Sequence, residues 1–213
     1  MRSIGPFVVV LGVTFAALPA RAQFTYSVDD GVGSGNSGFA QTSDMLWGNY
    51  FFAQPGANVI TTISAAFGSV NGRPIEIHLF DDPDDDGNPA NAIPITSATG
   101  VAQRPSVNFI ADYAITPTQV QGGFFVAIRM RTNAGEFPAR RDDTTPRGQS
   151  WIAAAPLATG LDLANLGSSP VYFNLNQNVP PSNWMVRATG IPAPGTFALA
   201  LASLAPLSRR RRS

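Results

Sequence analysis

The sequence predicts an all-β protein, an antiparallel β-sandwich of the jelly-roll type. Three observations support this prediction. No helical period persists for ten residues within residues 24–189, short runs of β-branched and aromatic side chains recur there, and clusters of Gly, Pro, Asn and Asp separate the runs. Many short strands at this spacing are typical of sandwiches and jelly rolls. We divide the chain into an N-terminal signal (1–22), the β-sandwich domain (23–190) and a C-terminal sorting tail (191–213).

The expected strands follow one another along the domain, each bounded by turn-forming residues. Alternation is clearest where Ile75, Ile77 and Leu79 share one face, which predicts a strand with one side in the core. The expected strands are Phe24–Val28, Met45–Ala53, Asn58–Phe67, Pro74–Phe80, Ile93–Ala98, Ser106–Ile115 with an internal break, Gly123–Arg131, Ser150–Ala154, Val171–Asn174 and Asn183–Thr189.

Each of the three tryptophans falls in an expected strand. We expect Trp47, Trp151 and Trp184 to fill the space between the two sheets, because indole rings bury a large apolar area. The alternative is an exposed platform that stacks on sugars, and two exposed, coplanar tryptophans would identify it.

The chain contains neither Cys nor Lys. Without Cys it cannot form disulfides, thiolate metal sites or a Cys nucleophile. Without Lys it has no primary amine for Schiff-base chemistry and no P-loop lysine. The stability of the domain must therefore come from its core.

The formal net charge of zero conceals an acidic domain. Six of the 14 basic residues lie in the terminal segments, at Arg2, Arg21 and Arg209–Arg212, whereas all 14 acidic residues lie between Asp29 and Asp162. Without those six arginines, 8 basic residues face 14 acidic ones, a net charge of −6. Because an acidic surface repels phosphate backbones, we expect no nucleic acid partner.

The N-terminus has the parts of a Sec signal peptide. Arg2 precedes an apolar stretch, and Ala20 and Ala22 form an Ala-x-Ala box, so we expect cleavage after Ala22. The apolar stretch is shorter than the roughly 20 residues that a membrane span needs. The expected partners are the Sec translocon and signal peptidase, and the expected location is outside the cytoplasm.

The C-terminus joins a Pro-rich motif to an apolar run over residues 197–207 and a basic end. Four arginines do not readily cross a membrane, and an 11-residue apolar run covers only about half of a bilayer core, so the layout suits a transient hold in the inner membrane. The residues of the motif and the basic end are Pro192, Ala193, Pro194, Gly195, Arg209, Arg210, Arg211 and Arg212.

This tail resembles a PEP-CTERM sorting signal over the last 23 residues or so, with Ala193 where the family's motif has Glu. The resemblance implies processing by an exosortase-type membrane peptidase. It also implies delivery to the cell envelope, the outer surface or the extracellular space.

An acidic run directly after an expected strand resembles the first half of a calcium loop. Counted from Asp82, it places Asp82, Asp84 and Asp86 at positions 1, 3 and 5, Gly87 at position 6 and Asn88 at position 7. Position 12 holds Ile in place of the bidentate Glu of an EF-hand. The sequence leaves two interpretations open, a Ca²⁺ site and a solvated acidic turn.

Other motifs carry less chemistry. The G-x-G-x-x-G pattern of residues 33–38 precedes no helical pattern, so we expect a flexible loop and no dinucleotide site. His78 is the only histidine; we expect it on the surface or in sheet packing, with Glu76 on the same face. We expect Arg140 and Arg141 in an exposed loop.

These features favour an exported cell-surface or extracellular-matrix protein with a structural or adhesive role. A carbohydrate-binding module, dependent on calcium or not, is the alternative, with extracellular polysaccharide as its partner. A glycoside hydrolase ranks third, because it requires an acidic cleft around Glu76, His78 and residues 81–86. We therefore expect no enzymatic activity.

Overall fold

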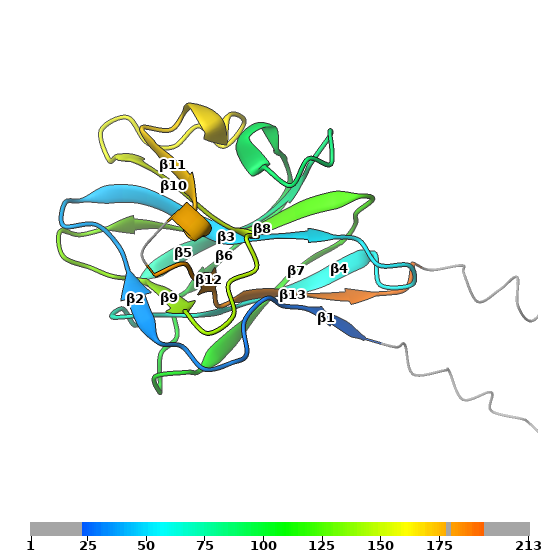
Figure 1. Ribbon diagram of the computed structural model, residues 1–213, viewed down its shortest axis with the longest axis horizontal. Helices are drawn as coiled ribbons and strands as arrows, with labels where there is room; N and C mark the ends of the chain where they lie inside the picture. The colour runs from blue at the N-terminus through cyan, green and yellow to red at the C-terminus, as the bar shows by residue number, and fades with distance from the viewer. Residues whose placement is uncertain (1–22, 178–179, 194–213) are drawn as a thin grey trace, which may run out of the picture.

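The structure is a computed structural model that describes residues 23–177 and 180–193 (Figure 1). The predicted antiparallel β-sandwich is confirmed, since every strand pair within the described residues is antiparallel. Its strands are β1 (Phe24–Tyr26), β2 (Gly35–Ser37), β3 (Ser43–Phe52), β4 (Val59–Ala66), β5 (Pro74–Asp81), β6 (Ile93–Val101), β7 (Ile110–Gln119), β8 (Gly123–Thr132), β9 (Ala139–Asp142), β10 (Ser150–Pro156), β11 (Val171–Asn174), β12 (Asn183–Trp184) and β13 (Val186–Ile191). Three short 3₁₀ helices complete it: η1 (Pro89–Asn91), η2 (Leu166–Ser168) and η3 (Leu175–Gln177).

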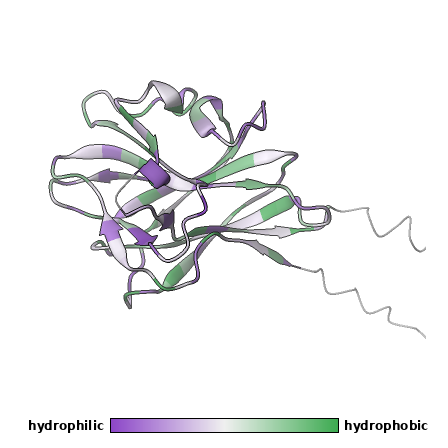
Figure 2. Cartoon of the chain, in the orientation of Figure 1, coloured by the Kyte–Doolittle hydropathy of each residue, from purple (hydrophilic) through white to green (hydrophobic). Residues whose placement is uncertain are grey.

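Two large sheets form the layers of the sandwich. The six-stranded sheet has the order β11-β10-β3-β8-β5-β6, and the four-stranded sheet has the order β1-β13-β4-β7. A small third sheet, β12-β9-β2, joins one end. Hydrophobic residues gather on the strands of the two large sheets, whereas β2 and β9 are hydrophilic (Figure 2).

The main core lies between the inner faces of the two large sheets. Along β5 the predicted alternation is confirmed, because Ile75, Ile77 and Leu79 all belong to this core. Nine of the ten residues of β3 are buried, and β8 is nearly as enclosed. The six-stranded sheet is therefore covered on both faces, and its outer face carries a second, smaller apolar cluster.

A buried amide joins the two layers. Asn49 on β3 donates from Nδ2 to the carbonyl oxygens of Trp184 (2.8 Å) and Val186 (2.6 Å). Its Oδ1 lies 2.6 Å from the hydroxyl of Ser150 on the neighbouring strand. Asn49 is fully buried, so these hydrogen bonds are shielded from water and fix the start of β13 against the six-stranded sheet.

The expectation of an exposed loop at residues 140–141 is wrong. These residues lie in β9, which pairs with β2, and the Arg140 side chain is buried. Its guanidinium donates to Asn36 (2.9 Å) and Asn108 (3.1 Å) and to the carbonyl oxygen of Gly33. Because those partners come from distant parts of the chain, the local sequence gave no sign of the burial.

The glycine-rich segment also differs from expectation. Part of it, Gly35–Ser37, forms β2 instead of a flexible loop. The segment leads to β3, so a strand follows where a dinucleotide site needs a helix.

The seventh strand lies four residues further along the chain than expected, at Ile110–Gln119 instead of Ser106–Ile115. It contains Pro117, which breaks the sequence pattern of a strand. Because β7 is the edge strand of its sheet, a residue without a backbone N–H is tolerated there.

Both ends of the described domain leave from one side. β1 pairs with β13 so that Phe24 lies opposite Gly190, and the start of β1 and the end of β13 lie on the same side of the domain (Figure 1). The expected signal-cleavage residues Ala20 and Ala22 lie outside the described residues, as does the sorting tail beyond Ala193. Within the described residues no helix is long and apolar enough to cross a bilayer.

Replacing Asn49 tests the link between the layers. Asn49→Ala leaves two buried carbonyl oxygens without a donor, so we expect the free energy of unfolding to fall by about 2–5 kcal/mol. Urea denaturation measures it. Asn165→Ala is the control, because the side chain of Asn165 is exposed and forms no cap hydrogen bond. Equal losses in the two variants would contradict the role of Asn49.

Candidate functional site

The outer face of the six-stranded sheet is the candidate site. Two loops lie on it, the acidic loop (residues 82–88) with η1 after it, and the segment 157–170 that contains η2. Leu166 of η2 and Ala92 after η1 are buried against Leu46 and Phe125 of the sheet. The sheet thus holds the acidic loop in place through apolar contacts.

Three carboxylates of the acidic loop converge. One oxygen each from Asp82, Asp84 and Asp86 lies within 4.8 Å of the others. Asp82 is buried, with 3% of its surface exposed, while Asp84 and Asp86 are exposed. The carboxylates that the sequence pattern grouped as positions 1, 3 and 5 are therefore brought together in space.

Specific hydrogen bonds tie the acidic loop to the sheet. The Tyr50 hydroxyl on β3 donates to Asp82 Oδ2 at 2.8 Å. The backbone N–H of Gly123, at the start of β8, donates to Asp85 Oδ1. A Cβ atom at Gly123 would clash with the Tyr50 hydroxyl, so glycine suits this close approach.

The structure gives Asn88 a role within the fold. Its Oδ1 accepts hydrogen bonds from the Tyr172 hydroxyl on β11 and from the backbone N–H of Ala90 (3.2 Å). These bonds cap η1 and fasten the end of the acidic loop to the edge of the sheet.

The electrostatics of the acidic loop suit a divalent cation. Asp82 Oδ1 is buried without a hydrogen-bond partner among the described residues. Burial, together with the neighbouring Asp84 carboxyl, raises the pKa of Asp82. Calcium takes oxygen ligands at about 2.3–2.6 Å, so two ligands on opposite sides of the ion are about 4.6–5.2 Å apart. Three oxygens that all lie within 4.8 Å of one another are close enough together to reach a single ion of this size.

A charged network occupies the other end of the same face. Arg129 on β8 donates from Nε (2.9 Å) and Nη2 (2.6 Å) to Asp44, and from Nη1 to Glu76 Oε2 (3.0 Å). Glu76 Oε2 also lies 3.0 Å from His78 Nε2, as expected for neighbours on one face of a strand. Asp44 further accepts a hydrogen bond from the backbone N–H of Leu161 and so anchors the second loop.

Burial sets the protonation of this network. Desolvation of the Asp44 carboxyl would raise its pKa, but hydrogen bonds from Arg129 and from the Leu161 N–H outweigh it and lower the pKa. Desolvation lowers the pKa of His78, against the opposing effect of Glu76. Asp44 and Arg129 therefore form a buried ion pair, beside which His78 is neutral near pH 7.

The acids named for a hydrolase do not surround one cleft. Glu76 and Asp81 lie near opposite ends of β5, five residues or about 17 Å apart. The Glu76 carboxylate is engaged with Arg129 and His78, whereas the acidic loop faces Tyr50 and the start of β8.

The tryptophans divide between the two faces. Trp47 and Trp184 are buried in the main core, as expected. Trp151 lies on the outer face instead, half-buried, with its ring stacked on that of Tyr172 at 5.3 Å between centroids. The described domain thus lacks the pair of exposed, coplanar tryptophans that would identify a stacking platform.

The pH dependence of stability tests the burial of His78. Below its ordinary pKa of 6.5, the unfolded chain protonates His78 more readily than the folded protein does. The free energy of unfolding should therefore fall below about pH 6.5, by up to about 1.4 kcal/mol per pH unit. In His78→Gln this slope should be smaller. Between about pH 7 and 8.5 the free energies of unfolding of the two proteins should change with pH in the same way. Urea denaturation across the pH range decides, and identical slopes below pH 6.5 would contradict the prediction.

Comparison with known proteins supports the fold class alone. No protein-family model and no curated protein matches the chain. Among solved structures, it is similar to one that contains the cysteine protease and lectin-like domains of Cwp84, a surface layer associated protein of Clostridium difficile, with a TM-score of 0.54 and 13% identity. That match covers 80% of this chain and 36% of the other. A second structure of the clostridial cysteine protease Cwp84, after propeptide cleavage, matches with a TM-score of 0.53 and 13% identity over 80% of this chain and 40% of that one. The chain thus spans less than half the length of the structures that it resembles.

Proposed function

We propose that this protein is an exported surface protein with a structural or adhesive role, whose β-sandwich holds a calcium ion in its acidic loop. The observation that carries the calcium assignment is Asp82, a buried carboxylate with one unpartnered oxygen beside two exposed carboxylates. A buried anion without a cation is costly, and a bound Ca²⁺ removes that cost. The ion would also join the acidic loop more firmly to the sheet.

The position of the chain ends supports export and sorting. β1 and β13 are neighbours, so the signal and the tail both attach at one side of the described domain. The main core described above is formed by residues 26–188, so we expect it to persist after both segments are removed. On this proposal, an exosortase-type peptidase releases the tail after the Sec pathway has delivered the protein.

A carbohydrate-binding role is the second candidate, and the similarity to Cwp84 favours it. This chain has no Cys and is built of strands, so we infer that its counterpart in Cwp84 is the lectin-like domain and not the protease. At 13% identity this similarity supports a shared architecture, and the ligand has to be argued from the residues of this chain.

Calcium should stabilise the protein. At a concentration one-hundredfold above Kd, a bound ligand adds about 2.7 kcal/mol to the free energy of unfolding, which raises Tm by about 5–10 °C for a domain of this size. We expect this rise with CaCl₂ relative to EDTA, and a smaller one with MgCl₂, which dehydrates less readily. Differential scanning calorimetry measures it.

Matched variants locate the calcium effect. Asp84→Asn and Asp86→Asn should abolish most of the rise in Tm, while Asp112→Asn should retain it. Asp112 is a suitable control because it lies on β7 in the other sheet, and the variant keeps an acceptor for the Ser64 hydroxyl. If CaCl₂ does not raise the Tm of the unmodified protein, or raises the Tm of all the variants equally, the calcium site is refuted.

Processing is tested by intact mass. Protein recovered from the native envelope and medium should lack residues 1–22 and should end near Pro194. Full-length protein made in the cytoplasm is the control. A mature form that retains Arg212 would overturn the sorting hypothesis and indicate a tail-anchored envelope protein.

A further inference from the structure

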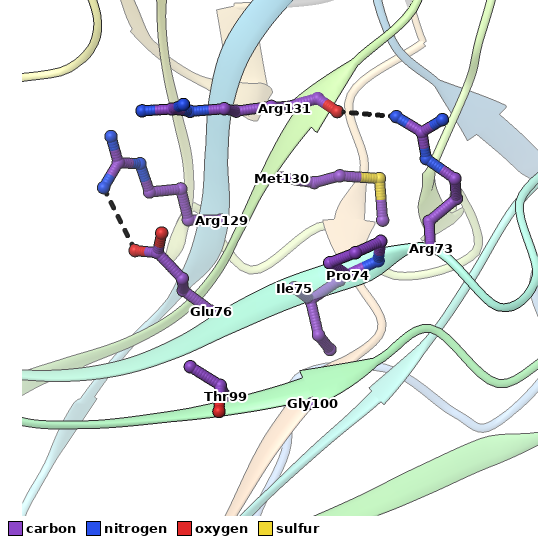
Figure 3. A pocket seen from close by; sticks show the side chains of 9 residues that line it. All are labelled: Arg73, Pro74, Ile75, Glu76, Thr99, Gly100, Arg129, Met130 and Arg131. Carbon is purple, nitrogen blue, oxygen red and sulfur yellow. Dashed lines mark hydrogen bonds and ion pairs between the residues drawn. The ribbon is translucent and has the colours of Figure 1, made fainter.

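A pocket lies on the outer face at the end away from the acidic loop. It has a volume of about 370 Å³ and is formed by β5, β6 and the end of β8, which is within the range of about 300–1,000 Å³ typical of small-molecule sites. Its polar side chains include Glu76, Thr99, Arg129 and Arg131 (Figure 3). Pro74 adds an exposed apolar ring to the rim.

The charged network holds one wall of the pocket in place. Arg129 is fixed by its bonds to Asp44 and Glu76, and Glu76 Oε2 accepts from Arg129 Nη1 and lies 3.0 Å from His78 Nε2. Because Asp44 is fully buried, this arrangement rests on the sheet and not on a surface loop. The Glu76 carboxylate therefore has a fixed orientation before any ligand arrives.

Three polar groups in the pocket retain free hydrogen-bonding capacity. Within the described chain, Glu76 Oε1 accepts no hydrogen bond, and the hydroxyl of Thr99 has no partner. Thr99 lies directly opposite Glu76 in the register of β5 and β6. The guanidinium of Arg131 is exposed and forms no ion pair in that part of the chain.

The charges around the pocket balance. Arg73 pairs with Glu136 at 3.5 Å, and Arg129 pairs with Asp44 and Glu76. With Arg131 added, the three guanidinium groups of the lining are matched by three carboxylates, of which Glu76 lines the pocket while Asp44 and Glu136 lie behind it as ion-pair partners. An anionic ligand would also meet the exposed oxygen of Glu76, which disfavours it. The pocket thus suits a neutral ligand that both donates and accepts hydrogen bonds.

We propose that this pocket binds a neutral sugar residue of a polysaccharide. Glu76 Oε1 accepts from one hydroxyl of the sugar, Arg131 donates to its neighbour, Thr99 bonds to either, and the C–H face of the ring packs on Pro74. This inference rests on the proposed adhesive role and adds that the adhesive ligand is a neutral polysaccharide. It requires no aromatic platform, which agrees with the burial of Trp47 and Trp184.

The position of the pocket favours contact with an external polymer. β13 ends at Ile191, which pairs with Val59 at the start of β4. This end of the domain therefore lies beside the turn between β3 and β4. The pocket is at the opposite end of β8, about 26 Å from the start of that strand. A domain held by its tail would therefore present the pocket away from the membrane.

Affinity electrophoresis of the full-length protein tests the proposal. Native gels would contain dextran, galactan or glucomannan as neutral probes, or polygalacturonate as the anionic one. We expect at least one neutral probe to retard the protein and polygalacturonate not to. Arg131→Gln and Thr99→Val should each weaken the retarding affinity about tenfold, as expected for the loss of one good hydrogen bond. Arg147→Gln is the matched control, an exposed arginine far from the pocket that should leave retardation unchanged.

Three results would overturn the proposal: no retardation by any neutral probe, retardation that the pocket variants leave unchanged, or a preference for polygalacturonate, which would indicate an anion site. None of these affects the calcium or processing tests. The protein could lose its tail and bind calcium and yet be retarded by none of the three neutral probes. In that case only the assignment of the pocket is refuted, and the adhesive role involves another ligand.

Discussion

β3 and β8 run through the middle of the six-stranded sheet with both faces buried, and this obliges the chain to cover the outer face. The four-stranded sheet packs on the inner face. On the outer face Leu46, Phe80 and Phe125 need a second layer, which two loops supply. The position of the acidic loop is therefore a consequence of packing. Any ion that it binds would act on the layer of loops that covers the outer face of the sheet.

Polar anchors give this cover its definite position, because apolar contacts alone are not directional. At one end the Tyr50 hydroxyl binds Asp82. At the other, Asp44 receives both the Leu161 N–H and the Arg129 guanidinium. Each anchor is a buried carboxylate, and its negative charge needs a positive partner. Arg129 is that partner for Asp44, and the proposed cation would be the partner for Asp82. These two buried charges therefore underlie the pocket and the proposed calcium site.

The sequence predicted those parts of the fold that depend on local pattern. Alternation placed β5 correctly, and the expected strand Val171–Asn174 coincides with β11. It failed for β9, where Arg140 is buried because Asn36 and Asn108 accept its hydrogen bonds from 104 and 32 residues away. The convergence of Asp82, Asp84 and Asp86 was predictable because the loop is short, but the burial of Asp82 depends on Tyr50 from another strand. The pocket combines three strands, so no local motif announces it.

The two ends of the outer face differ in how firmly they are held, and this difference fits the two roles proposed for them. In the Asp44–Arg129–Glu76 network each charged group has a partner of opposite charge without a ligand, which orients the pocket wall in advance and lowers the entropic cost of recognition. The acidic loop has an unpartnered buried oxygen, so it gains most from a bound ion. Gly123 and Asp81 lie at one end of β8 and β5, and Arg129 and Glu76 pair toward the other end of the same two strands. Calcium at the first end would therefore stiffen the strands that support the pocket. Such a domain would be most stable outside the cell, where calcium is plentiful, and there its pocket would face away from the tail.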